Sequence, residues 1–147
     1  MNYLDTSALI KRFVEETGSP LIQTLVTHST PVATAKIAYA EVYAALTRRR
    51  WAGDLSSGQY SLACRQFADE WPAYVQVDLR DDILVLARDL IQRHRLKGFD
   101  AIHLASALSL KSALGRDITF VAADARLLRS AEAERLRSLN VETAHAP

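Results

Sequence analysis

Short apolar runs that suit β-strands alternate with longer segments of helical period along this chain of 147 residues. This alternation constrains the fold most, because strands separated by helices pair in parallel and need helices on both faces of their sheet. The expected strands are Asn2–Leu4, Pro31–Thr34, Tyr74–Val77 and Ile118–Ala122, with a last edge strand at Val141. The pattern therefore predicts an α/β fold built on a parallel sheet.

Helices are expected over residues 6–16, 20–28, 36–51, 56–71, 81–97, 99–113 and 124–136. Thr6 and Ser7 offer capping hydroxyls for the first of them, and Gly53 ends the third. No repeat, low-complexity tract or long linker divides the sequence. We therefore expect one domain over residues 1–147.

The composition is that of an ordinary globular domain, with 49% hydrophobic and 24% charged residues. Lys plus Arg number 18 and Asp plus Glu 17, so global charge argues neither for nor against a nucleic-acid partner. Cys64 is the single cysteine, which excludes an intrachain disulfide and favours a reducing compartment. Without a signal-peptide pattern or an apolar run of about 20 residues, we expect a cytoplasmic protein with no membrane partner.

Four acidic residues stand in apolar surroundings: Asp5, Glu41, Asp100 and Asp124. A carboxylate in such a setting is costly unless it is paired, hydrogen-bonded or bound to a metal. Asp5 and Asp124 follow predicted strands, and ligands of open α/β sheets bind at the carboxyl ends of strands. All four acids could therefore face one edge of the sheet.

Each carboxylate also has an interpretation without a metal. Asp5 and Asp124 precede predicted helices, where Asp is a favoured N-cap residue. Asp100 lies at the start of a helix, near the favourable end of the helix dipole. Glu41 shares its helix face with apolar residues three and four positions away, so it would need a partner such as a nearby Arg.

Taken together, the four acids suit a hard divalent cation. Mg²⁺ prefers oxygen ligands, keeps several waters and usually takes one or two carboxylates directly. We expect Asp5 and Asp100 to bind the ion, with Glu41 and Asp124 either coordinating it or orienting bound water. No His/Cys cluster has the spacing of a zinc site.

The segments around these acids resemble the motifs of PIN domains, in particular those of the VapC toxins of toxin–antitoxin systems. The matching segments are Asn2–Lys11, Ala40–Val42, Phe99–Leu108 and Phe120–Asp124. The resemblance implies a three-layer α/β/α PIN-like fold with a central, mostly parallel sheet of about four to five strands. It also implies an endoribonuclease that depends on Mg²⁺ or Mn²⁺ and leaves a 5′-phosphate and a 3′-hydroxyl. A small VapB-like antitoxin would silence it, and the toxin would be a homodimer.

Several residues near the acids have two interpretations. Ala122 stands where many relatives carry Thr or Ser, which affects how Asp124 and its water would be positioned. Thr6 and Ser7 could bond Asp5 or a metal-bound water, or simply cap a helix. His103 could be a general base, or a core histidine that supports the acids.

Basic residues near the motifs are candidates for binding single-stranded RNA: Lys11, Arg12, Arg93, Arg95 and Lys97. The run Arg48–Arg50 beside Trp51 could also bind phosphates, but a solvated helix end is the slightly preferred interpretation. Two aromatic sets could form a groove for an antitoxin helix or belong to the core: Tyr39, Tyr43 and Trp51, and Tyr60, Phe67 and Trp71. A non-catalytic PIN-like module that binds RNA or protein is the alternative function.

Overall fold

The computed structural model describes residues 1–28 and 31–144. Within these ranges five strands form one sheet, in the order β3-β2-β1-β4-β5, and every neighbouring pair is parallel. The strands are β1 (Asn2–Leu4), β2 (Val32–Ala35), β3 (Val75–Val77), β4 (Thr119–Ala122) and β5 (Arg137–Asn140). The predicted parallel sheet is confirmed, and β1 lies at its centre.

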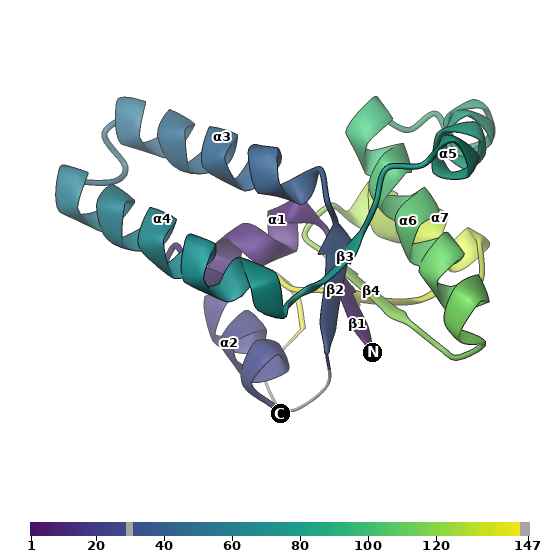
Figure 1. Cartoon of the computed structure of the whole chain (residues 1–147), viewed down its shortest axis with the longest axis horizontal. Coiled ribbons are helices and arrows are strands. Elements are labelled where there is room, and N and C mark those ends of the chain that lie inside the picture. Colours follow the sequence, from purple (N-terminus) through teal and green to yellow (C-terminus); the bar gives the residue numbers. More distant parts are fainter. Residues whose placement is uncertain (29–30, 145–147) are drawn as a thin grey trace.

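Helices cover both faces of this sheet. They are α1 (Thr6–Leu9), α2 (Ser19–Thr27), α3 (Ala38–Trp51), α4 (Ser57–Glu70), α5 (Asp81–His94), α6 (Gly98–Leu114) and α7 (Ala125–Ala133), with 3₁₀ turns η1 (Ile10–Arg12) and η2 (Trp71–Ala73). Figure 1 shows α1 to α4 on one side of the sheet and α5, α6 and α7 on the other. The three-layer α/β/α fold expected from the resemblance is confirmed.

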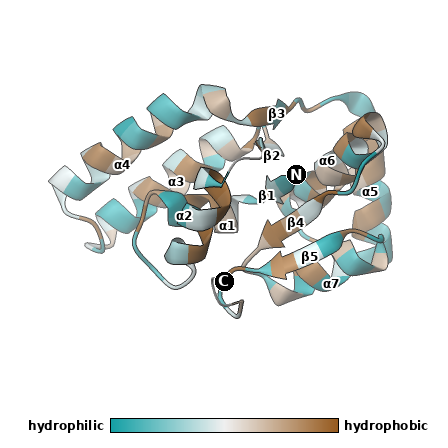
Figure 2. Cartoon of the chain, turned by 90° about the horizontal axis from the view of Figure 1, so that it is seen from below, coloured by the Kyte–Doolittle hydropathy of each residue, from teal (hydrophilic) through white to brown (hydrophobic). Residues whose placement is uncertain are grey.

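The central strands are buried on both faces, and their residues alternate between two cores. Tyr3 and Phe120 pack among the residues of α5, α6 and α7, and their rings stack at 5.5 Å. Leu4 and Val121 instead pack among the residues of α1 to α4. Such strands need apolar residues on both faces, which is why β4 is largely brown in Figure 2.

Two elements differ in kind or place from their predictions, and the helices predicted over residues 81–97 and 124–136 each end three residues early, as α5 and α7. The helix expected over residues 6–16 stops early, as α1 and η1, because Ser19 Oγ donates to Val14 O at 2.8 Å and accepts from Glu16 N at 3.0 Å. These bonds hold the segment in a turn. The last strand is β5 rather than Val141. Its residues are mostly polar, because an edge strand is only partly buried, so no apolar run in the sequence indicated it.

The parallel arrangement brings the starts of several helices to one edge of the sheet. α1 follows β1 directly, α3 follows β2, and α7 follows β4. The carboxyl ends of parallel strands all point to this edge, so side chains from distant parts of the sequence meet there. Among the described residues, no helix is long and apolar enough to span a membrane.

Candidate active site

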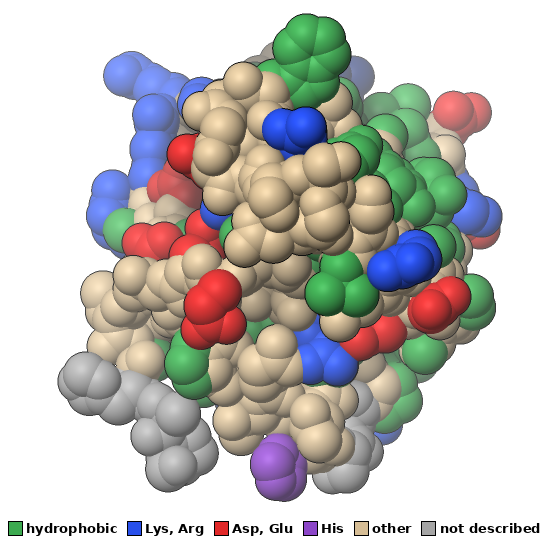
Figure 3. Space-filling view, turned by 90° about the vertical axis from the view of Figure 1, so that its left-hand side faces the viewer, with side chains coloured by type: hydrophobic (Ala, Val, Ile, Leu, Met, Phe, Trp, Pro, Cys, Tyr) green, Lys and Arg blue, Asp and Glu red, His purple; other side chains and the backbone are tan. Residues whose placement is uncertain are grey.

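A polar cleft of about 570 Å³ lies at the carboxyl edge of the sheet. Three of the four acids expected at one site line it: Asp5, Glu41 and Asp100. They come from the β1–α1 junction, the first turn of α3 and the first turn of α6. In the face of the molecule drawn in Figure 3, acidic side chains gather beside a column of basic ones.

Asp5 is the most deeply buried of these acids, with 5% of its surface exposed. It caps α1, since its Oδ1 accepts from Ala8 N at 2.9 Å. Ser7 Oγ donates to the same carboxylate, at 2.7 Å from Oδ1 and 2.9 Å from Oδ2, and accepts from Ala123 N at 2.9 Å. Burial, with a contribution from the charge of Asp100, raises the pKa of Asp5 to about 6 against the bonds and charges that lower it. Asp5 is therefore both a helix cap and a carboxylate poised to gain a counter-ion.

Glu41 is held by a hydrogen-bond network that reaches into the core. Its Oε1 accepts from Thr6 Oγ1 at 2.8 Å and lies 2.7 Å from His103 Nε2. His103 Nδ1 lies 3.1 Å from the hydroxyl of Tyr3. Both ring nitrogens of His103 are therefore engaged, Nε2 by Glu41 and Nδ1 by Tyr3. His103 thus orients Glu41 from the buried side.

The network also determines the charge of Glu41. Burial by itself acts to raise the pKa of Glu41, but the hydrogen bonds from His103 and Thr6 and the charges of His103 and Arg48 outweigh it and lower the pKa. The interpretation of Glu41 without a metal named a nearby Arg as its partner, and the structure instead places His103 Nε2 at 2.7 Å. Glu41 is consequently ionised at neutral pH.

Asp100 and Asp124 lie near each other, but only Asp100 lines the cleft. Burial, followed by the charge of Asp124, raises the pKa of half-buried Asp100, while His103 and Lys97 act to lower it. Asp124 is exposed and caps α7: its Oδ1 accepts from Arg126 N at 2.7 Å and from Leu127 N at 3.2 Å. Asp124 therefore acts on the site through its charge, from outside the cleft.

Most of the basic residues proposed for RNA are not brought to the cleft. Arg12 pairs with Glu70 at 2.8 Å, outside the residues that line the cleft. Arg93 pairs with Glu134, and Arg95 ends α5 with φ 55°. Lys97 is exposed just before α6, where its charge acts on Asp100.

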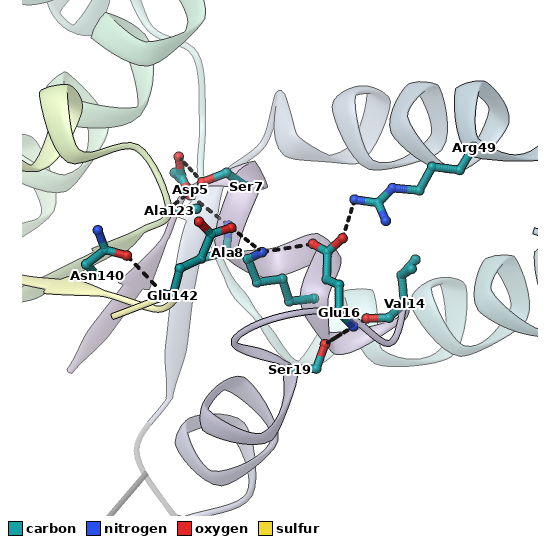
Figure 4. A network of polar contacts seen from close by, with 11 residues as sticks. Asp5, Ser7, Ala8, Val14, Glu16, Ser19, Arg49, Ala123, Asn140 and Glu142 are labelled. Atoms are coloured by element: carbon teal, nitrogen blue, oxygen red, sulfur yellow. Dashed lines mark hydrogen bonds and ion pairs between the residues drawn. The ribbon is translucent and has the colours of Figure 1, made fainter. Parts of the chain in front are cut away.

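Lys11 does line the cleft, but it is only 4% exposed and is neutralised. Its Nζ donates to Glu16 and to Glu142, at 2.9 Å in each case. Glu16 pairs on its other oxygen with Arg49, whose guanidinium lies 2.6 Å from Glu16 Oε2, and Figure 4 shows these two side chains pointing toward each other. The lysine therefore ties η1 to the chain after β5.

Arg48 and Arg49 also line the cleft, although the sequence favoured a solvated helix end for them. The signal that could have found Arg48 is its position seven residues after Glu41, about two helical turns along the same face. No comparable spacing in the sequence indicates that Glu16 meets Arg49, or that the chain returns after β5 and brings Glu142 to the cleft. Their place at the cleft is a product of tertiary structure.

The aromatic residues of α3 and α4 mostly pack against one another. Phe67, which is fully buried, lies 5.3 Å from Tyr43 and 5.4 Å from Trp71 between ring centroids. Trp51 is an exception, with 84% of its surface exposed. The aromatic sets therefore serve the packing of α3 on α4, with Trp51 outside it.

No three or more His, Cys, Asp and Glu side chains in the described part of the chain are arranged as a ready metal site. The carboxylate oxygens of Asp5 and Glu41 are turned toward their hydrogen-bond donors, Ser7 and Ala8 on one side and Thr6 and His103 on the other. The three acids of the cleft thus share a space without forming a preformed cage.

Comparison with known proteins gives consistent matches. The family model described as "PIN domain" matches residues 3–133. Ribonuclease VapC45 and Ribonuclease VapC49, from Mycobacterium tuberculosis strains CDC 1551 / Oshkosh and ATCC 25618 / H37Rv, are each 37% identical over 108 residues, which cover 74% of this chain and 75% of each relative. A toxin-antitoxin complex from Klebsiella pneumoniae contains a chain of the same fold, with a TM-score of 0.62, 20% identity, and 84% and 87% of the two chains covered.

Proposed function

The chain belongs to the PIN domain family, and from this premise we propose that it is a metal-dependent endoribonuclease toxin inhibited by a small antitoxin protein. The observation that carries the proposal is the convergence of Asp5, Glu41 and Asp100 in one polar cleft. The relatives at 37% identity are named ribonucleases, which supports RNA as the substrate.

The donor set of the cleft fits Mg²⁺ or Mn²⁺. It offers carboxylate oxygens, and the pKa of Asp5 and that of Asp100 are raised by burial and by neighbouring acids, so a cation would relieve both. Mg²⁺ needs only one or two carboxylates beside its waters, which agrees with a cleft that holds no three-residue cage among the described residues. Asp5 and Asp100 would hold the ion, and Glu41 and Asp124 would bind it or orient its water.

When bound, the cation would lower the pKa of a water and stabilise negative charge on a phosphoryl oxygen. Glu41 is ionised, and Thr6 and His103 hold its Oε1. Its Oε2 is left to accept a proton from the attacking water. Attack of this water on phosphorus would break the bond to the 3′ oxygen, which would take a proton from solvent, so the products would carry a 5′-phosphate and a 3′-hydroxyl.

An RNA cleavage assay with Mg²⁺, Mn²⁺ or EDTA tests this proposal. Asp5→Asn and Asp100→Asn should each lower cleavage by at least about 100-fold, because each removes a group that acts at the reacting atoms. Asp69→Asn is the matched control, since Asp69 is exposed on α4 and the chemical change is the same. Undiminished cleavage in EDTA, or by both variants, would overturn the metal assignment.

The partner assignment has its own test. The Klebsiella pneumoniae complex of similar fold is a toxin-antitoxin complex, which supports a small VapB-like protein as the partner. If a small VapB-like protein is encoded beside this chain, its co-expression with the chain should yield a complex that no longer cleaves RNA. If this chain and the co-expressed small protein purify separately, the partner assignment is wrong.

Sedimentation analysis of the chain alone tests the expected homodimer.

A non-catalytic PIN-like module that binds RNA or protein remains the second candidate. It is favoured by the methyl group of Ala122, which stands where a hydroxyl would support Asp124. Calorimetric titration with Mn²⁺ distinguishes the two functions. The enzyme predicts binding that Asp5→Asn abolishes, and the module predicts no binding at the cleft.

A further inference from the structure

The last turn of α3 carries three successive arginines, Arg48, Arg49 and Arg50. Successive residues of an α-helix point about 100° apart, because one turn takes about 3.6 residues. Arg48 and Arg49 therefore line the cleft, whereas Arg50 is not among the residues that line it; Arg48 and Arg50 are both exposed, and Arg49 is partly buried. Three residues of identical chemistry are thus placed in three different environments.

The charges on this wall of the cleft are balanced except for one. Lys11 and Arg49 face Glu16 and Glu142, and each cation lies within 2.9 Å of a carboxylate oxygen. The guanidinium of Arg48 pairs with no carboxylate among the described residues. Within that part of the chain, Arg48 is the cation of the cleft wall that is left to bind an external anion.

Arg48 also lines the same cleft as Asp5, Glu41 and Asp100. It follows Glu41 by about two turns of α3, and its charge contributes to the lowered pKa of Glu41 that burial alone would raise. An anion bound by Arg48 would therefore lie beside the acids without displacing any hydrogen bond of Glu41.

We propose that Arg48 binds a phosphate of the RNA substrate next to the phosphate that is cleaved, an inference that rests on the proposed function. A guanidinium binds phosphate through two parallel hydrogen bonds, which gives both affinity and register. Lys11 or Arg49 would have to leave a carboxylate to do the same. Arg48 needs no such exchange, so the substrate gains the full interaction.

The test compares Arg48→Gln with Arg50→Gln, which remove the same charge from the same helix end. The probe is a fluorescently labelled single-stranded RNA of mixed sequence, and its binding is followed by anisotropy in EDTA. Arg48→Gln should raise Kd roughly tenfold, the effect of losing a charge-assisted hydrogen bond. Its plot of log affinity against log salt should also be shallower by about 0.7, as expected for one lost contact to single-stranded phosphate.

The same pair is then compared in steady-state cleavage with Mg²⁺. Arg48→Gln should raise KM by a similar factor while kcat stays within about twofold, because the contact is made equally in the bound and the transition state. Arg50→Gln should match the unmodified protein in Kd, salt dependence and KM. Equal melting temperatures of the two variants would show that neither has lost its fold.

The outcomes separate the two proposals. If cleavage needs metal and Arg48→Gln behaves as Arg50→Gln does, the assignment of Arg48 is wrong and the proposed function stands. A fall in kcat without a change in KM or Kd also overturns it. If the unmodified protein neither binds nor cleaves RNA, both proposals fail.

Discussion

At the scale of the residue, Asp5 shows how a structural role and a functional role coincide. Its carboxylate caps α1 through Ala8 N, and it lies in the cleft with Glu41 and Asp100. The sequence left the helix cap and the metal ligand as alternatives. The structure supports the cap directly, and the raised pKa shows that the cap alone does not offset the cost of burying the charge.

Asp5→Asn should therefore stabilise the metal-free protein at neutral pH. Because the pKa of Asp5 is about 6 in the folded protein and 3.8 for an ordinary aspartate in the unfolded chain, the folded protein binds this proton more tightly than the unfolded chain does. The free energy of unfolding thus falls as the pH rises from about 4 to about 6, by at most about 3 kcal/mol for a shift of roughly two units. Urea denaturation in EDTA should show the variant more stable at pH 7.

The control for that measurement is the same comparison at pH 4. There Asp5 is protonated in the folded protein, so the advantage of the asparagine should be small. An advantage that is as large at pH 4 as at pH 7 would show that it does not come from the buried charge.

His103 and Glu41 should be energetically coupled. His103→Leu leaves Oε1 of Glu41 without its donor at 2.7 Å, and the loss should be smaller when Glu41→Gln has already removed the charge. Hydrogen bonds to charged groups contribute about 1.5–3 kcal/mol, so the coupling energy from a double-mutant cycle should fall in that range. Denaturation of the four proteins in EDTA measures it, and strictly additive losses would contradict the network.

At the scale of the element, helix starts and ends decide which side chains reach the cleft. α1 is short, so the chain turns at Glu16 and brings this residue to Lys11 and Arg49. α7 begins at the exposed cap Asp124, so this acid stays outside the cleft. The sequence predicted both helices, but neither their ends nor the consequences for the site followed from periodicity.

Two glycines with similar φ angles allow a test of how closely the start of α2 approaches the segment after β5. Gly18 has φ 93° and an added Cβ would lie 2.5 Å from Val141 O, whereas Gly53 has φ 85° and nothing within 4 Å. Gly53→Ala should cost about 1 kcal/mol, the strain of a left-handed conformation. Gly18→Ala should cost at least about 2 kcal/mol, because the segment after β5 must also move. Thermal denaturation of both variants checks the difference, and equal losses would contradict the close approach.

At the scale of the whole molecule, the site joins segments that are distant in the sequence. β1, α3 and α6 contribute Asp5, Glu41 and Asp100, and Tyr3 links the site to the core through His103. A ligand at this junction contacts several elements at once. Its binding should therefore stabilise the fold as a unit.

Mg²⁺ should raise the melting temperature of the unmodified protein and leave that of Asp5→Asn almost unchanged. A ligand at about 100 times its Kd stabilises the native state by about 2.7 kcal/mol, which corresponds to about 5–10 °C for a domain of this size. Differential scanning fluorimetry with Mg²⁺ and with EDTA measures the shift. Asp69→Asn should respond as the unmodified protein does, and an equal response of Asp5→Asn would contradict its role as a ligand.

The sequence by itself determined the layered α/β fold, because apolar strands buried on both faces and helices of regular period follow from local patterns. It also singled out the four acids, since a carboxylate among apolar neighbours is recognisable without coordinates. Only the tertiary structure decided which of them share the cleft, and that Lys11 is neutralised while Arg48 has no carboxylate partner among residues 1–28 and 31–144. These outcomes depend on contacts between residues far apart in the chain, and such contacts leave no periodic signal in the sequence.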